Sequence, residues 1–534
     1  MAKPKTPNQK RKYGELNKRL AKYVMLVESI YEDLNLEAAK IVGITDFAID
    51  SDRPFMWSNY PQTRKRIRAL QERFVEDIGS VIYSGISEEW KNSNEVQDLL
   101  ANKVLQTYGA TIGKEKYEIL YQPNNDALKA FQQRKDKGFT ISDKLWNQST
   151  LYKQELEEAI SCAIQKGTSA ITLSKQISKY LLDFPQLQKD YKERFGKASR
   201  AMDCEYRSIR LAASEINMAY RQAENLRWQQ MDFVVGYEIK LSGSHHIDDI
   251  CDQLKGKYPK TFVWTGWHPN DMCYKIPILK TEEEFWEWDG RSEATTASVN
   301  EVKDVPDAFK KWVLDNQERI STAKKRNTLP YFLRDNKSVY QKITVESSIS
   351  EIVKRASSVG DEVQSIAERI AIKNGGYVTP INFKSTTSIT RKVITEGITP
   401  YDIKDAVRTT IIVPKSRIED VLEELYKTEG FLRLKRQKPE SFMGYSGNIV
   451  NIRTTNGLTA EIQVNTERMI FAKERPEDAK RILGKKRWEE IHNETGMEGG
   501  LGHKYYEQWR ILDKSSNEAL KIVENSIEYY SHFR

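Results

Sequence analysis

Apolar side chains recur every three or four positions along much of the first 230 residues. This spacing gathers them on one face of a helix, which is typical of a helix packed against a core. From about 14 to 42 the face contains Leu16, Leu20, Val24, Val27, Ile30 and Leu34. After the prolines of SDRPFMWSNYPQ it contains Ile67, Leu70, Phe74, Ile78 and Val81. From about 205 to 230 it contains Ile209, Ala212, Ile216, Ala219, Ala223 and Leu226. We therefore predict a mainly helical N-terminal region.

The pattern changes between about 231 and 345. Short β-like pieces, Phe233–Leu241 and Thr261–Trp264, alternate with Gly, Pro, His and Cys as far as about 280. Residues 281–345 are rich in Glu, Trp and Lys and show little sustained periodicity. We predict a small irregular β segment followed by a helical connector.

The last 190 residues have a third pattern. A helical run around 347–373 precedes RTTIIV, whose β-branched side chains favour a strand. A helix is predicted at Ile418–Tyr426, strands near 447–453 and 459–464, and helices from there to the end. This order indicates an α+β domain with a sheet of several strands.

The length of 534 residues exceeds what one core can serve, so we expect a multidomain protein. The predicted parts are a helical region (1–230), a Cys/His-containing β segment (231–290), a connector (291–345) and an α+β domain (346–534).

Composition narrows the function only a little. The net charge of +8 permits contact with DNA but does not require it. No stretch approaches the roughly 20 apolar residues that span a bilayer, so we expect no membrane span. The basic N-terminus lacks the apolar segment of a secretory signal, which predicts synthesis and use in a cytoplasm. Four cysteines are too few for a disulfide scaffold.

The passage from His245 to Leu279 concentrates histidine and cysteine. Its imidazoles and thiols are the nitrogen and sulfur ligands that zinc prefers. The candidate zinc ligands are His246, Cys251, His268 and Cys273, with His245 beside them. The alternative is that the cysteines pack as small apolar residues and the histidines cap turns. A zinc ion here would hold together a loop-rich segment that has little core of its own.

This passage resembles the signature of the phage Mu F-like (MuF) head morphogenesis proteins. The elements that carry the resemblance are the helix RSIRLAASEINMAYRQAENLRW, Asp248 to Cys251, Leu254 to Gly256, His268-Pro269, Cys273 and Pro277. Asp271 stands where the family often has a cysteine, and the second cysteine that commonly follows the first is absent. The resemblance covers roughly residues 1–340. It implies a minor head protein inside the virion near the portal, with portal and capsid proteins, and phage DNA, as partners.

Four motifs follow in order in the C-terminal region: NFKSTTSITRK, YDIKDAVRTTIIV, GYSG and EIQVNT, with GLGHKYYEQWR further on. Their cationic side chains, Lys384, Lys392 and Arg408, are suited to neutralising a triphosphate. Asp405 and Glu461 are candidate Mg²⁺ ligands, because Mg²⁺ prefers carboxylates together with phosphate oxygens. Glu461 is also a candidate base for the attacking hydroxyl, and Tyr445 a platform for a nucleobase. Taken singly, each motif is usually a solvated helix face, a turn or an amphipathic strand, so the signal is their occurrence together in this order.

The order of the motifs resembles the RelA/SpoT-type nucleotidyltransferase fold, the synthetase domain of alarmone enzymes. The resemblance implies that Lys384 and Ser388 hold ATP phosphates, Asp405 binds Mg²⁺, Tyr445 stacks on the acceptor base and Glu461 supports catalysis. The remaining candidate residues are the nucleotide-binding Arg391, Gln463 and His503. Three positions depart from the family pattern: Asn382 and Asn465 replace arginines, and Ile449 replaces a histidine.

Two functional hypotheses follow. The first is a virion protein that carries a Mg²⁺-dependent ATP pyrophosphokinase as an effector or toxin, acting on a nucleotide or tRNA acceptor and opposed by an immunity protein. It would reach the host cytoplasm during assembly and after ejection. The second is a structural virion protein whose C-terminal domain is catalytically inactive and binds capsid, portal or DNA. A weaker third reading is a DNA-binding packaging accessory. The altered positions place guanosine tetraphosphate synthesis in question and leave pyrophosphate transfer to an adenine nucleotide or an RNA end open.

Overall fold

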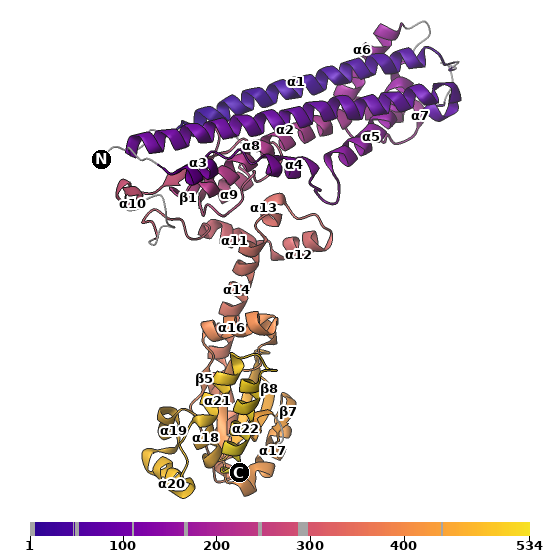
Figure 1. Ribbon diagram of the computed structural model, residues 1–534. Helices are drawn as coiled ribbons and strands as arrows, with labels where there is room; N and C mark the ends of the chain where they lie inside the picture. The colour runs from indigo at the N-terminus through magenta and orange to yellow at the C-terminus, as the bar shows by residue number, and fades with distance from the viewer. Residues whose placement is uncertain are drawn as a thin grey trace. The chain divides into compact units, whose positions relative to one another are not determined.

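The computed structural model describes residues 6–45, 47, 53–108, 112–164, 169–243, 248–286, 297–438 and 442–534. The chain folds as two compact units, Met1–Tyr340 and Gln341–Arg534 (Figure 1). Among the described residues, no helix is both long and apolar enough to cross a membrane.

The first unit is built on long helices, as the periodicity predicts. Its main bundle contains α1 (Gln9–Val42), α2 (Arg64–Tyr108), α5 (Ile141–Ala163) and α8 (Cys204–Gln230). Figure 1 shows α1 and α2 side by side along much of their length. Shorter elements complete this part: η1 (Trp57–Asn59), η2 (Pro61–Thr63), α3 (Lys114–Leu120), α4 (Asn125–Gln133), α6 (Ala170–Leu182) and α7 (Phe184–Phe195). The predicted apolar faces form one core, with Leu16, Phe74 and Ile216 fully buried.

A small antiparallel sheet follows the bundle. Its order is β2 (Gly256–Tyr258), β1 (Val234–Lys240), β3 (Tyr274–Leu279), with α9 (Ile250–Leu254) between β1 and β2. The strand predicted at Phe233–Leu241 is confirmed as β1. Strand β3 was not predicted; it contains Pro277, which an edge strand tolerates because its outer side needs no ladder hydrogen bond.

The strand predicted at Thr261–Trp264 is wrong. These residues have irregular backbone, and side chains satisfy the polar groups that a neighbouring strand would otherwise have bonded. Asn336 donates to Val263 O at 2.7 Å and accepts from Val263 N at 2.8 Å. Asn225 on α8 donates to Trp264 O at 3.1 Å. The segment is therefore held by amide side chains rather than by a β ladder.

The predicted connector is mostly helical among its described residues, with irregular backbone at 297–306 and 326–330. It contains α10 (Glu282–Trp286), α11 (Asp307–Asp315), α12 (Gln317–Lys325) and α13 (Tyr331–Arg334), followed by α14 (Lys337–Ser358). It is more than a spacer, because Phe309 and Phe332 are buried and pack edge-on against Phe262 and Trp267 respectively. Helices α11 and α13 thus belong to the folded first unit.

The second unit is an α+β fold around one mixed sheet. The strand order is β4 (Tyr377–Val378), β6 (Val407–Ile412), β9 (Thr459–Asn465), β8 (Gly447–Arg453), β7 (Phe431–Gln437), and β5 (Asn382–Phe383) also pairs with β6. Only β6 and β9 run parallel, with Arg408 level with Glu461 and Thr410 level with Gln463. The strands predicted from RTTIIV and near 447–453 and 459–464 are confirmed, whereas β7 was not predicted.

The two faces of this sheet differ in chemistry. One face is apolar: Val407, Ile411, Ile462 and Val464 pack with residues of α14, α15 (Gly360–Lys373) and α17 (Ile418–Tyr426). The helix predicted around 347–373 is in fact two, α14 and α15. They part at Val359, whose backbone is not helical, beside Gly360, where a Cβ would lie 2.6 Å from the Phe383 ring.

The other face is polar and is partly covered by the C-terminal helices. These are α18 (Glu467–Lys473), α19 (Pro476–Leu483), α20 (Lys485–Thr495), α21 (Leu501–Arg510) and α22 (Asn517–Ser531). They form a second small core around Phe471, Tyr529 and Phe533. The remaining elements are α16 (Thr386–Glu396), η3 (Pro400–Asp402), η4 (Lys415–Arg417) and η5 (Phe442–Gly444).

Candidate functional site

A polar surface follows the middle strands of the second unit. Side chains alternate across a strand, so the apolar Val407, Ile462 and Val464 leave Arg408, Glu461 and Gln463 on the opposite face. Because β6 and β9 are neighbours, Arg408 and Glu461 start about 5 Å apart at the backbone. The two predicted motifs that contain these residues, YDIKDAVRTTIIV and EIQVNT, therefore meet on one face.

An ionic cluster lies just before β6. Asp405 Oδ2 accepts from Lys384 Nζ at 2.5 Å, and Asp405 Oδ1 accepts from Lys392 Nζ at 3.0 Å. Burial opposes ionisation of Asp405, but the hydrogen bonds and charges of the two lysines outweigh it and hold the pKa of this carboxyl below its usual value. Asp405 is therefore a carboxylate at neutral pH.

The start of helix α16 adds backbone donors beside this cluster. Ser385 caps the helix by accepting from Ser388 N at 3.2 Å. Lys384 precedes the cap, and Lys392 lies one turn after Ser388 on the same side. A helix N-terminus that carries two ammonium groups is a suitable place for phosphate oxygens.

A hydrogen-bonded chain runs from Glu461 toward the C-terminal helices. Gln463 Nε2 donates to Glu461 Oε1 at 2.7 Å, and Lys473 Nζ donates to Gln463 Oε1 at 2.8 Å. Lys473 also forms an ion pair with Glu474 at 3.1 Å. This chain fixes the orientation of Glu461 relative to the sheet.

Glu474 belongs to the same charged group. Burial opposes its ionisation, but Lys473, Arg408 and His503 together lower the pKa of its carboxyl. Their influence shows that Arg408 and His503 both face this acid from different elements. His503 Nε2 is buried and has no hydrogen-bond partner among the described residues, so it is available to a ligand at this face.

Tyr445 stands at the far end of the chain of contacts. Its hydroxyl and the Asn465 side chain are 2.9–3.1 Å apart, and its ring meets the Tyr530 ring edge-on with centroids 5.6 Å apart. Gly447 permits this arrangement, since a Cβ there would lie 2.5 Å from the Tyr445 hydroxyl. The second glycine of GYSG is thus required by the tyrosine's position.

The structure brings most predicted residues of the second unit into two adjoining groups. The first contains Lys384, Ser388, Lys392 and Asp405. The second contains Arg408, Tyr445, Glu461, Gln463 and His503. Arg391 is exposed on α16 and makes no side-chain hydrogen bond or ion pair with the described residues of either group. Sequence reasoning missed Lys473 and Glu474, because they look like ordinary charges on a short amphipathic helix.

The donor set fits Mg²⁺. Asp405, just before β6, and Glu461, on β9, supply two carboxylates, and Mg²⁺ binds through one or two carboxylates plus substrate phosphates. Glu461 Oε1 is partnered by an amide rather than by a cation, so its charge is free to face a metal. Asp405 is ion-paired with Lys384 and Lys392, the two ammonium groups that are suited to phosphate oxygens.

A cavity of about 760 Å³ lies elsewhere on this unit. It opens at the carboxyl ends of β6 and β9 and is lined by residues such as Val413, Thr466 and Arg534. It contains none of the predicted catalytic side chains. We place the site on the open polar face instead, because the predicted catalytic side chains lie there.

The predicted zinc residues of the first unit also come together in part. Cys251, His268 and Cys273 lie with Asp249 and Asp271 in two overlapping groups of metal-ligand type. His246 lies outside the described residues.

Comparisons with known proteins agree with the α+β fold of the second unit. No family model matches the chain. The chain is 35% identical over 181 residues to the "(p)ppApp synthetase toxin Tas1" of Pseudomonas aeruginosa, a match that covers 34% of this chain and 41% of the relative. The chain thus spans less than half the length of this relative.

Two solved structures are also similar to part of the chain. One is the crystal structure of the complex between the Type VI effector Tas1 and its immunity protein. The matched chain in it is 35% identical in sequence, and the match covers 35% of this chain and 97% of that one, with a TM-score of 0.33. The small alarmone synthetase 1 from Bacillus subtilis is 16% identical over 34% of this chain and 92% of its own, with a TM-score of 0.22. The similarity of this part of the chain to Tas1 rests on the sequence identity of 35%.

Proposed function

About a third of the chain is a Tas1-like RelA/SpoT (small alarmone synthetase) domain, and we propose that this domain is an ATP-dependent pyrophosphokinase that acts as a toxin. The observation that carries the proposal is the arrangement of Lys384, Lys392 and Asp405 beside the Glu461–Gln463–Lys473 chain. It sets a phosphate-binding helix end next to a carboxylate on one sheet face.

The proposed reaction needs few covalent roles from the protein. A hydroxyl oxygen of the acceptor attacks the β-phosphorus of ATP, the bond from that phosphorus to the α–β bridging oxygen breaks, and AMP leaves. Lys384, Lys392 and the α16 N-terminus hold the phosphates, and Arg408 offsets charge on the transferred group. Glu461 accepts the hydroxyl proton, with Gln463 keeping its carboxylate oriented. Asp405 and Glu461 would hold Mg²⁺, which would neutralise charge on the phosphates.

The acceptor we propose is an adenine nucleotide, because the named activity of Tas1 is (p)ppApp synthesis. Tyr445 would stack on its base, with the ring held by Asn465 and Tyr530. An immunity protein is the corresponding partner, since Tas1 forms a complex with one. Such a partner would protect the cell that makes the toxin.

For the first unit we propose a role as a phage head protein that carries the toxin domain into the virion. The support is that the MuF-like sequence elements form one folded block: α8 donates from Asn217 and Arg221 to the backbone of the segment that contains His268-Pro269 and Cys273. Cryo-electron microscopy of particles, together with mass spectrometry of purified virions, tests the location. Absence of the chain from intact particles would contradict it.

The competing proposal is an inactive C-terminal module that binds capsid, portal or DNA. It is supported by Asn382, Ile449 and Asn465 at positions where the family pattern has ionisable side chains. Incubation of the purified chain with Mg²⁺, ATP and ADP, followed by ion-exchange separation and mass spectrometry, separates the two. The pyrophosphokinase yields AMP and an adenine nucleotide enlarged by two phosphates, whereas the inactive module yields neither.

A further inference from the structure

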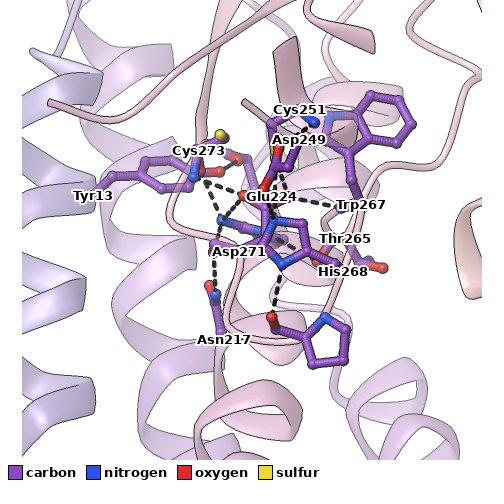
Figure 2. Close-up of polar contacts among 12 residues, drawn as sticks. Tyr13, Asn217, Glu224, Asp249, Cys251, Thr265, Trp267, His268, Asp271 and Cys273 are labelled. Carbon is purple, nitrogen blue, oxygen red and sulfur yellow. Dashed lines mark hydrogen bonds and ion pairs between the residues drawn. The ribbon is translucent and has the colours of Figure 1, made fainter. Parts of the chain in front are cut away.

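An unassigned cluster of ligand-type side chains lies beside the small sheet of the first unit. Asp249 precedes α9, Cys251 is on α9, His268 and Asp271 are in the irregular segment after β2, and Cys273 precedes β3. Their ligand atoms form two groups, Asp249–Cys251–His268 and Cys251–Asp271–Cys273, each within 4.8 Å (Figure 2). Cys251 is common to both groups.

The spacing in the first group suits a tetrahedral ion. Cys251 Sγ lies 3.2 Å from His268 Nε2, and His268 Nε2 lies 3.2 Å from Asp249 Oδ2. Zinc bonds of about 2.0–2.3 Å place the ligand atoms of a tetrahedral site roughly 3.3–3.8 Å apart. A small outward shift of these side chains would accommodate the ion.

The orientation of His268 is that of a metal ligand. Its Nδ1 lies 2.8 Å from Pro269 O and, when protonated, donates to that carbonyl. Nε2 is then the unprotonated nitrogen, and it faces a thiol sulfur and a carboxylate oxygen. Metal-binding histidines commonly use one nitrogen for the metal and donate from the other to a backbone carbonyl. A cation between the three atoms accounts for their convergence.

Asp271 has a different role. Its carboxylate accepts from Trp267 N and from Cys273 N, both at 2.7 Å, and lies 3.7 Å from Arg221 Nη2. With these partners it fixes the backbone that carries His268 and Cys273. Asp271 is therefore a positioning residue, and its place in the cluster explains why an aspartate can stand where a cysteine is common in MuF-like proteins.

We propose that Asp249, Cys251, His268 and Cys273 bind one zinc ion, with Cys273, which groups with Cys251 but not with both Asp249 and His268, shifting toward the other ligands when the ion binds. Two thiolates, an imidazole and a carboxylate are donor types that zinc accepts, and four protein ligands make a closed, structural site. The ion would tie α9, the segment at 259–273 and the start of β3 together, where the described backbone is held mainly by side chains of α8 and Asn336. The fourth ligand differs from the sequence prediction, with Asp249 in place of His246.

The test is the zinc content of the full chain, purified without a metal-affinity tag under reducing conditions. We expect one zinc per chain by elemental analysis, and loss to background in Cys251→Ser and His268→Ala. Cys162→Ser is the matched control, because Cys162 lies on α5 away from the cluster and should leave the zinc in place. Asp271→Asn should retain zinc but weaken its affinity by about 10- to 100-fold.

Cobalt substitution of the wild-type chain keeps the proposal testable if a variant fails to fold. We expect the visible absorption of tetrahedral Co²⁺ and a thiolate charge-transfer band of a two-thiolate site. The proposal is overturned if the wild-type chain holds no zinc before or after incubation with a zinc salt. A disulfide between Cys251 and Cys273 in freshly purified protein, or unchanged zinc affinity in Asp249→Ala, would equally contradict the ligand set.

Discussion

Lys384 Nζ lies 2.5 Å from Asp405 Oδ2, and this ion pair joins the start of α16 to the start of β6. Lys392 holds the other oxygen of the same carboxylate. The ion pair connects the proposed ATP phosphate site to β6, the strand that carries Arg408. The residues proposed to bind phosphate and those proposed to act in catalysis are thus held by the same contact.

Removal of Lys384 is expected to weaken use of ATP. Lys384→Met deletes a charge-assisted contact worth about 1.5–3 kcal/mol, which corresponds to a fall in kcat/KM for ATP of roughly 10- to 150-fold. Lys404→Met is the control, because Lys404 is exposed and precedes Asp405 in the sequence, but its side chain forms no ion pair within 4.0 Å among the described residues. Steady-state kinetics with varied ATP measures both. Equal effects in the two variants would show that Lys384 has no particular role.

The pH dependence of stability should reveal Asp405. Its folded pKa lies below the unfolded value, so its ion pairs stabilise the fold above about pH 4 and this contribution is lost as pH falls through the folded pKa. The difference in Tm between the wild type and Asp405→Asn should be largest near neutral pH and shrink below pH 4 (near-UV circular dichroism). A difference that is constant from pH 7 to pH 3 would contradict the assignment.

Tyr445 is expected to act through its ring. Tyr445→Ala should raise the KM for the acceptor by roughly 5- to 150-fold, the equivalent of about 1–3 kcal/mol for one stacked base. Tyr445→Phe keeps the ring and removes only the hydrogen bond with Asn465, so it should stay within a few-fold of wild type. If phenylalanine fails as badly as alanine, the hydroxyl rather than the stack is the important group.

Variants of Lys473 distinguish a role of this residue in stability from a role in catalysis. Lys473→Met leaves Glu474 without its nearest cation and should lower stability, whereas Lys473→Met combined with Glu474→Gln should recover most of it. Activity should remain low in both, because Gln463 loses the donor that orients it toward Glu461. Thermal unfolding and pyrophosphate transfer, measured on the same samples, test this. Recovery of activity together with stability would make Lys473 purely structural.

Much of the fold follows from local patterns, and the failures have physical causes. The sequence predicts helices α1, α2 and α8 and the β-branched strand β6, because their buried residues recur at regular spacing along one face. Strand β7 does not, since Arg433 and Lys435 are exposed on this edge strand and its backbone pairs on one side only. The segment Thr261–Trp264 has strand-like residues but is bonded by Asn225 and Asn336, which lie far away in sequence.

Candidate site residues could be predicted from the sequence where the motif itself contains the charged or reactive side chain. Lys384, Asp405 and Glu461 were identified from residue type and order. The partners that orient them were not: Lys473 reaches Gln463 only because α18 folds back over the sheet, and Tyr530 reaches Tyr445 from the last helix. Asp249 was not among the predicted zinc ligands, because an aspartate before a short helix is typical of an N-cap, which it also is.

The most direct test of the account is pyrophosphate transfer by the full chain. Wild type and Glu461→Gln are incubated with Mg²⁺ and ATP labelled in the β and γ phosphates, with ADP, ATP, GDP, GTP or total tRNA as acceptor. We expect label on the adenine nucleotides with wild type, and a fall of about 10²- to 10⁴-fold with Glu461→Gln, the range for loss of a general base. No transfer to any acceptor, or equal transfer by both proteins, would contradict the account.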